Sequence, residues 1–194
     1  NKDYKSNSEQ YLFAIVQGSS YKNLRIQNAK DLAALNFDGY AIGGLAVGEP
    51  RDEMYKTLEW VIPELPKDKA RYLMGVGYPQ EIVQAVKRGV DMFDCVIPTR
   101  EARHGRLYLW ENDNLDFEGF YSTISIKNEK FKEDFGPIDK KCDCYTCRNF
   151  SRAYLNYLFK INDALFMRLS SIHNIHFYQT LMKKIQDGIE NGEI

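Results

Sequence analysis

The sequence has no long hydrophobic run, and no stretch approaches the length of apolar segment that crosses a bilayer. Its first ten residues are polar and carry no signal-peptide pattern. They also lack an initiator methionine, so we expect the chain to be part of a longer, cytoplasmic protein. The net charge is only −1, which excludes a globally basic nucleic-acid-binding protein and leaves local patches as the route to any nucleic acid.

Cysteine is scarce as well, with four residues in 194, and three of them lie between positions 142 and 147. This distribution is unlike a secreted disulfide framework. The pattern Cys142-x-Cys144-x2-Cys147 instead favours a tetrahedral zinc site in which protein ligands fill all four positions. The alternative is three buried or free thiols. Among the histidines we prefer His173 to His176 as fourth ligand, because we expect His173 to begin a helix after a break.

Short apolar stretches alternate with amphipathic ones over the first half of the chain. The periodicity predicts strands over 12–16, 40–42, 71–74 and 91–98, and helices over 24–35, 52–61 and 79–88. In the first helix we expect Leu24, Ala29 and Leu32 to face inward, with Arg25 outside. This alternation indicates a parallel sheet covered by helices, either doubly wound or part of an eight-stranded barrel.

The pattern changes after residue 106. Acidic residues with Asn and Gly over 111–120 predict an exposed loop or hairpin, and 121–126 alternates like a strand. Helices are expected over 151–170 and 175–189.

Candidate functional residues lie where the predicted strands end, at Gln17, Gly43-Gly44, Gly75 and Asp94. The carboxyl ends of parallel strands share one edge, so we expect these groups to converge there. Asp94 is the most informative, because a carboxylate inside a buried strand must be paired or functional; a strand-end cap is the alternative. The glycine turns suit phosphate binding or are simply tight turns, and Gly75-Val76-Gly77 lacks the dinucleotide fingerprint.

Three further features are each open to two interpretations. Cys95 could be a nucleophile, but no histidine is placed beside it by sequence, which favours a small buried hydrophobe. The basic run over 100–106 is either a solvated face or a phosphate clamp. Glu49 could bind a ligand amine or cap the helix at Asp52.

Together these motifs resemble the tRNA-guanine transglycosylase (queuine tRNA-ribosyltransferase) family. The matching segments are residues 15–18, 43–49, 72–77, 91–100 and the set Cys142, Cys144, Cys147 and His173. The resemblance implies an α/β fold, a partial (β/α)8 TIM barrel of the last four or so βα units with an inserted zinc-binding subdomain. It divides the chain into the C-terminal barrel half (1–106), the hairpin and zinc subdomain (107–173) and a terminal helix packing back on the barrel (174–194).

The resemblance also implies roles. Asp94 would be the nucleophile that attacks C1′ of the wobble guanosine of a tRNA, forming a covalent ribosyl-enzyme that a 7-deazaguanine base then displaces. Residues implied in base binding are Gln17, Gly43, Gly44, Leu45, Val47, Met74 and Gly75. Those implied in RNA binding are Gly75, Val76, Gly77, Tyr78, Pro79, Gln80, Glu81, Thr99, Arg100, Glu101, Ala102 and Arg103. Structural Zn²⁺ would be bound by Cys142, Cys144, Cys147 and His173. The implied partners are the tRNA anticodon loop, the bases preQ1 and guanine, and a second copy of the chain, paired through the zinc subdomain.

Two features refine the expectation. Val47 resembles the bacterial members, which use preQ1, because a branched side chain there shrinks the space for the cyclopentene group of queuine. The general acid/base aspartate of the family lies in the N-terminal half, and its motif is absent, so we expect this chain alone to be inactive.

The alternatives to this function are a non-catalytic, zinc-stabilised RNA-binding or dimerisation paralogue, and a barrel half that binds the phosphate of a small metabolite. The 111–122 stretch is longer than the family's hairpin and has no assigned role.

Overall fold

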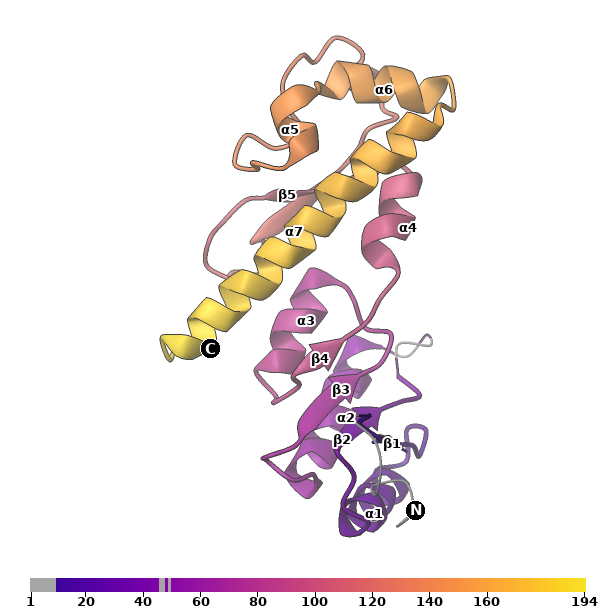
Figure 1. Ribbon diagram of the computed structural model, residues 1–194, viewed down its shortest axis with the longest axis vertical. Coiled ribbons are helices and arrows are strands. Elements are labelled where there is room, and N and C mark those ends of the chain that lie inside the picture. Colours follow the sequence, from indigo (N-terminus) through magenta and orange to yellow (C-terminus); the bar gives the residue numbers. More distant parts are fainter. Residues whose placement is uncertain (1–9, 46–47, 49) are drawn as a thin grey trace. The chain divides into compact units, whose positions relative to one another are not determined.

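The computed structural model describes residues 10–45, 48 and 50–194. The chain forms two compact units, the first ending at Cys95 and the second beginning at Val96, and each is described by itself (Figure 1). No helix of the described ranges is long and apolar enough to cross a membrane.

The first unit is a parallel sheet with connecting helices. Its elements are β1 (Phe13–Val16), α1 (Lys22–Ala34), β2 (Gly39–Ile42), α2 (Arg51–Val61), the 3-10 turn η2 (Ile62–Glu64), β3 (Ala70–Leu73), α3 (Pro79–Val86) and β4 (Met92–Phe93). The strands lie in chain order, β1-β2-β3-β4, and every neighbouring pair is parallel. Unreversed order is the order of a (β/α) barrel, whereas a doubly wound sheet reverses at its switch point. The predicted α/β class with part of a barrel is confirmed.

The two faces of this sheet differ in burial. Val16, Ile42 and Leu73 are neighbours across the strands and are fully buried, in one core with Met54, Leu58 and Val61 of α2. The adjacent row contains Ile15, Ala41, Tyr72 and Met92; its two end members are 45% exposed, whereas Ala41 is buried. Successive strand residues point to opposite faces, so Ile15 and Met92 lie on the face that a closed barrel turns inward.

Arg25 of α1 departs from the prediction. We expected it in solvent, but it has no exposed surface, whereas Leu24 is 58% exposed. Its guanidinium group donates hydrogen bonds to main-chain carbonyl oxygens, which compensates for the lost hydration.

The expected buried strand over 91–98 is also wrong. β4 contains only Met92 and Phe93, Asp94 follows it and is exposed, and a helix begins at Ile97. Pro98 explains the change, because a proline in the first turn of a helix removes an N–H that has no helical partner.

The second unit is mainly helical. Its elements are α4 (Ile97–Arg103), β5 (Arg106–Trp110), β6 (Tyr121–Ser125), the 3-10 turn η3 (Glu129–Phe131), α5 (Tyr145–Asn149), α6 (Arg152–Lys160) and α7 (Ala164–Glu190). β5 and β6 form an antiparallel hairpin, as predicted, with the 111–120 loop between them.

α7 is a single helix of 27 residues, drawn in yellow in Figure 1. The predicted break before His173 is therefore wrong. Ser170, His173 and Asn174 interrupt the apolar pattern and look like a helix end, yet all three are buried and hydrogen-bonded. Polar side chains with buried partners are compatible with a helix interior.

Asn174 ties three elements of this unit together. Its side-chain oxygen accepts from the N–H of Tyr108 at 3.3 Å, and its amide nitrogen donates to the carbonyl oxygens of Pro98 and Arg106, each at 3.0 Å. It thereby joins α7 to β5 and to the start of α4. The division of the chain at residues 106 and 173 stays a prediction.

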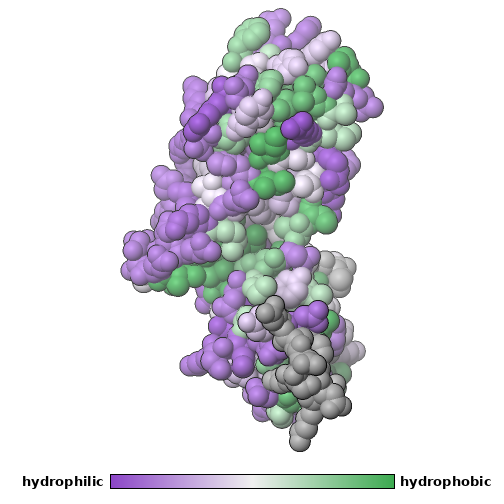
Figure 2. Space-filling view, in the orientation of Figure 1, coloured by the Kyte–Doolittle hydropathy of each residue, from purple (hydrophilic) through white to green (hydrophobic). Residues whose placement is uncertain are grey.

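The surface of the second unit carries large apolar side chains. Phe135 is 81% exposed and Tyr145 and Tyr157 more than half exposed, while Phe150 stacks on Tyr154 with ring centroids 5.5 Å apart. Figure 2 shows hydrophobic groups, in green, interspersed with hydrophilic ones over the displayed face of this unit.

Candidate active site and metal centre

Four predicted site segments follow the four strands of the first unit directly. Gln17 comes after β1, Gly43-Gly44 after β2, Met74-Gly75 after β3 and Asp94 after β4. We call these residues the carboxyl edge of the sheet. The parallel register brings their backbones to one side, as the sequence predicts.

Asp94 is held by two donors on neighbouring β3 and the turn after it. Its Oδ1 accepts from the hydroxyl of Tyr72 at 2.5 Å and from the N–H of Gly75 at 2.9 Å. The Tyr72 hydrogen bond, followed by that of Gly75, lowers the pKa of Asp94 below its usual range. The same hydrogen bond raises the pKa of Tyr72. The site thus presents an exposed, ionised carboxylate, and Tyr72 is a partner that the sequence did not single out.

Gly75 needs its backbone freedom for this contact. Its φ is +73°, in the left-handed region that favours glycine, and a Cβ there would meet nothing within 4 Å. Conformation, rather than lack of space, therefore requires glycine beside Asp94.

The amide of Gln17 lies against the two glycines after β2. A Cβ on Gly43 would come within 2.6 Å of Gln17 Nε2, and one on Gly44 within 2.8 Å of Gln17 Oε1. Gly44 also has a φ of +66°. The side-chain amide and the glycine backbone therefore form one polar surface, next to Leu45, which is buried. Val47 and Glu49 lie outside the described residues.

The first predicted RNA-binding segment, 75–81, is partly occupied by internal contacts. Val76, Gly77 and Pro79 are buried, and Gly75 is exposed. Glu81 pairs with Arg51, whose Nε lies 2.8 Å from Glu81 Oε1. Tyr78 and Gln80 are partly exposed.

The second predicted RNA-binding segment, 99–103, lies on α4 in the second unit. Arg100 and Arg103 are exposed and Ala102 is buried. Glu101 is 3.2 Å from Arg106 and 3.9 Å from Arg100, and Thr99 bonds the carbonyl oxygen of Val96. Two cationic side chains are thus displayed on one short helix.

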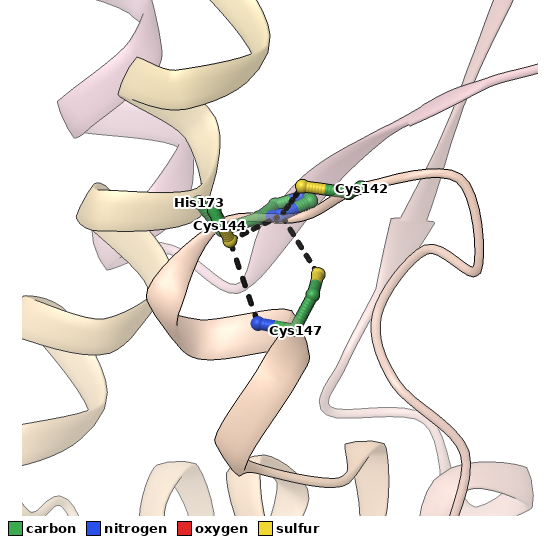
Figure 3. Close-up of side chains that lie close together, drawn as sticks. All are labelled: Cys142, Cys144, Cys147 and His173. Carbon is green, nitrogen blue, oxygen red and sulfur yellow. Dashed lines mark hydrogen bonds between the residues drawn. The ribbon is translucent and has the colours of Figure 1, made fainter.

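Three cysteines and one histidine meet in the second unit, as predicted (Figure 3). The Sγ atoms of Cys142, Cys144 and Cys147 lie 3.6, 3.7 and 3.3 Å from Nδ1 of His173, and all four ligand atoms are within 4.8 Å of one another. A tetrahedral zinc ion with Zn–S of about 2.3 Å and Zn–N of about 2.0 Å separates sulfur and nitrogen by about 3.5 Å. The four side chains therefore match the size of such a site.

The surroundings orient the ligands. The Nε2–H of His173 donates to the carbonyl oxygen of Tyr108 at 2.7 Å, which leaves Nδ1 as the ring nitrogen that faces the sulfurs. The sulfur of Cys144 accepts from the N–H of Cys147 and caps α5. His176 is turned elsewhere, with Nε2 2.9 Å from Asp143 Oδ1. The preference for His173 is supported by this geometry, although its predicted reason, a helix start, was wrong.

The electrostatics of the cluster differ from one ligand to the next. Hydrogen bonds from Cys142 and then Cys147 hold the pKa of Cys144 well below its usual range. Burial opposes a positive charge on His173, but hydrogen bonds to Cys142 and Cys144 outweigh it and raise its pKa to about 9. The same hydrogen-bond network raises the pKa of Cys147, through Cys142 first and then Cys144. Negative charge is thus placed on Cys144, and coordination of a cation by all three sulfurs would require the Cys147 thiol to lose its proton.

A family model described as queuine tRNA-ribosyltransferase matches residues 1–194. The match spans both the carboxyl edge and the Cys3His cluster, and it confirms the resemblance carried by the motifs. The chain therefore belongs to the queuine tRNA-ribosyltransferase family, the tRNA-guanine transglycosylases, which are glycosyltransferase-type enzymes that modify tRNA.

Proposed function

We propose that this chain is the nucleophile-bearing half of a tRNA-guanine transglycosylase that exchanges the wobble guanine of queuosine-family tRNAs for preQ1. The observation that carries the proposal is Asp94, an exposed and ionised carboxylate at the same sheet edge as Gln17 and Gly44. A purely structural carboxylate would not need an amide and a glycine turn at the same edge of the sheet.

The reaction is a double displacement. Because Oδ1 of Asp94 accepts two hydrogen bonds, we assign the attack to Oδ2. An Oδ2–C1′ bond forms as the C1′–N9 bond breaks, and the departing guanine takes a proton from the acid/base aspartate. The incoming 7-deazaguanine then bonds to C1′, releases Asp94 and returns its proton. Charge at C1′ in each transition state lies beside a carboxylate, as in a retaining glycosidase.

Base recognition falls to the polar surface of Gln17 and Gly43-Gly44. The Gln17 amide carries a donor and an acceptor that match a purine edge, and the backbone of Gly44 and Leu45 supplies further bonds. We assign Met74 and Gly75 to the lining of the same base-binding site. We retain preQ1 as the substrate on the grounds of the Val47 side chain.

RNA binding is assigned to the exposed parts of 75–81 and to α4. The exposure of Arg100 and Arg103 supports phosphate contacts there. Glu81 serves this segment indirectly, by holding Arg51 in an ion pair. We propose a cytoplasmic enzyme, where tRNA is found.

The Cys3His cluster holds structural Zn²⁺, because four protein ligands leave no open position for chemistry. The exposed aromatic residues of the second unit, among them Phe135, Tyr154 and Tyr157, support a homodimer that pairs through this subdomain.

The isolated chain is expected not to exchange bases. It lacks the acid/base aspartate motif, and the exposure of Ile15 and Met92 supports a barrel face that further chain covers in the complete enzyme. Incubation with tRNA and radiolabelled guanine checks this, and incorporation of label above the no-enzyme background would refute it.

The decisive test uses the complete enzyme, meaning this chain joined to the residues that supply the acid/base aspartate. Asp94→Ala should abolish the covalent RNA adduct seen on denaturing gels, while tRNA affinity changes less than about threefold, because phosphate contacts dominate affinity. Asp91→Ala is the matched control, since Asp91 pairs with Arg71 at the other end of the strands. An adduct that persists without Asp94 rules out this nucleophile. Binding of tRNA with no adduct even in the unmutated enzyme favours the non-catalytic paralogue.

A further inference from the structure

Arg25 is a fully buried cation directly behind the carboxyl edge. Its Nε donates to the carbonyl oxygen of Ser19 at 2.7 Å, and its Nη1 donates to those of Val16 at 3.2 Å and Gly43 at 2.7 Å. Its Nη2 donates to the carbonyl oxygen of Gly44 at 3.1 Å. One rigid guanidinium group therefore binds the turn after β1 and the turn after β2 at four points.

These bonds fix the direction of two peptide planes after β2. In a planar trans peptide, the C=O and the following N–H point in opposite directions. The carbonyls of Gly43 and Gly44 point at Arg25, so the N–H groups of Gly44 and Leu45 point away from it. Glycine offers no side-chain restraint of its own, and the φ of Gly44 is already in the left-handed region.

The same guanidinium restrains Gln17. It holds the carbonyl of Val16 and that of Ser19, on either side of Gln17 in the chain. The N–H of Gln17 is bound separately by Asn28 Oδ1 at 2.8 Å, also on α1. Both walls of the polar surface, the amide and the glycine backbone, are thus set from α1.

We propose that Arg25 is a positioning residue for purine recognition, which holds the Gly44 and Leu45 N–H groups and the Gln17 amide in the arrangement that a guanine-type base requires. The inference rests on the proposed function. Arg25 lies behind the surface and does not touch the base, so its loss weakens base binding without removing the nucleophile or the RNA contacts.

The test compares Arg25→Met and Arg25→Lys in the complete enzyme. Methionine keeps an unbranched chain and removes every donor, whereas lysine keeps the charge but offers one nitrogen where four carbonyls need donors. We expect the KM for guanine and for preQ1 to rise at least tenfold in both, while the KM for tRNA changes less than twofold. Arg71→Met removes an arginine from the amino end of β3 and should leave both constants unchanged.

A merely structural role predicts a different result. Leu58→Ala, which truncates a fully buried core residue, should lower the melting temperature without raising the KM for base. If Arg25→Lys folds with an unchanged KM for base, or if the KM for base and the KM for tRNA rise together, the inference is overturned. Should Arg25→Met not fold, Arg25→Lys alone decides.

Failure of the proposed function looks different. In that case the unmutated complete enzyme exchanges no base, or exchanges it without Asp94, whereas failure of the Arg25 inference leaves Asp94-dependent exchange intact.

Discussion

At the residue scale, the surroundings of Asp94 suit the two demands that the proposed double displacement makes of one carboxylate. Hydrogen bonds from Tyr72 and Gly75 lower its pKa, so that it is ionised, as the proposed attack on C1′ requires. The same stabilisation of negative charge makes it a better leaving group when the second base arrives. The basicity of Asp94 is thus a compromise between attack on C1′ in the first step and departure from C1′ in the second.

Tyr72→Phe in the complete enzyme should move the acid limb of adduct formation to higher pH. The substitution removes the largest cause of the lowered pKa, so the pKa of Asp94 rises toward its ordinary value. At a given acidic pH less of the carboxylate is then ionised. The measurement is the pH dependence of adduct formation, with Tyr55→Phe in the α2 region as control. If the acid limb stays at the same pH, Tyr72 does not lower the pKa of Asp94.

Asn174→Ala should destabilise the second unit by about 1–3 kcal/mol, because it removes three hydrogen bonds that join the N–H of Tyr108 and the carbonyl oxygens of Pro98 and Arg106 to α7. Urea unfolding followed by far-UV circular dichroism measures the change. Asn149→Ala removes an exposed amide that bonds Tyr145 within α5, and it should stay within about 0.5 kcal/mol of the unmutated chain. Equal effects from the two asparagines would contradict the assigned role of Asn174.

At the element scale, apolar periodicity predicted much of the fold. The first three strands, the buried face of α2 and strand β6 follow directly from it, whereas β4 is much shorter than predicted and β5 was not predicted as a strand. The cysteine spacing likewise predicted the metal cluster, because Cys142, Cys144 and Cys147 meet locally. Sequence patterns did not predict the features that depend on partners far away in the chain. A helical pattern assigns an arginine to solvent, and only the carbonyls of two turns make burial of Arg25 favourable.

The other errors have the same origin. His173 and Asn174 looked like a helix end because their buried partners lie on β5, far away in sequence. The apolar run of 91–98 looked like a strand because nothing local shows that β3 pairs only with Met92 and Phe93. The sequence did not identify Tyr72 as a partner of Asp94, because tyrosine is common in strands and only the fold brings its hydroxyl group to Asp94.

The metal ligands can be tested as a pair of histidine variants. His173→Ala should reduce bound zinc from about one equivalent to well below half, since it removes the only nitrogen ligand of the cluster. His176→Ala, three residues further along α7, should keep the full amount because His176 contacts Asp143 instead. Atomic emission on the purified chain measures both, and loss of zinc from the His176 variant would contradict the assignment.

At the scale of the whole molecule, the chain consists of two units with separate cores. Val16, Leu58 and Leu73 belong to the first, and Leu107, Ile126 and Leu155 to the second. The Cys3His cluster lies entirely in the second. Stability contributed by metal should therefore be confined to residues 96–194.

Metal removal should consequently affect the thermal unfolding of the second unit and not that of the first. Calorimetry of the isolated chain with a strong chelator should show the melting of the second unit shifted down by about 10 °C or more, because zinc-binding free energy is folding free energy. The transition of the first unit should stay in place. Tryptophan emission assigns the transitions, since Trp60 lies in the first unit and Trp110 in the second. A chelator that shifts both transitions equally would contradict independent units.

The spacing of the four ligands also bears on the order in which the second unit assembles. Three thiols lie within residues 142–147, and His173 follows Cys147 by 26 positions. An unfolded chain can gather an ion on the thiols first, and closing the remaining loop then costs only about 3 kcal/mol of chain entropy. Refolding should accordingly be faster with zinc present from the start than with zinc added later. In this order of events the ion would act as a nucleus that forms the 142–147 turn first and brings in α7 afterwards.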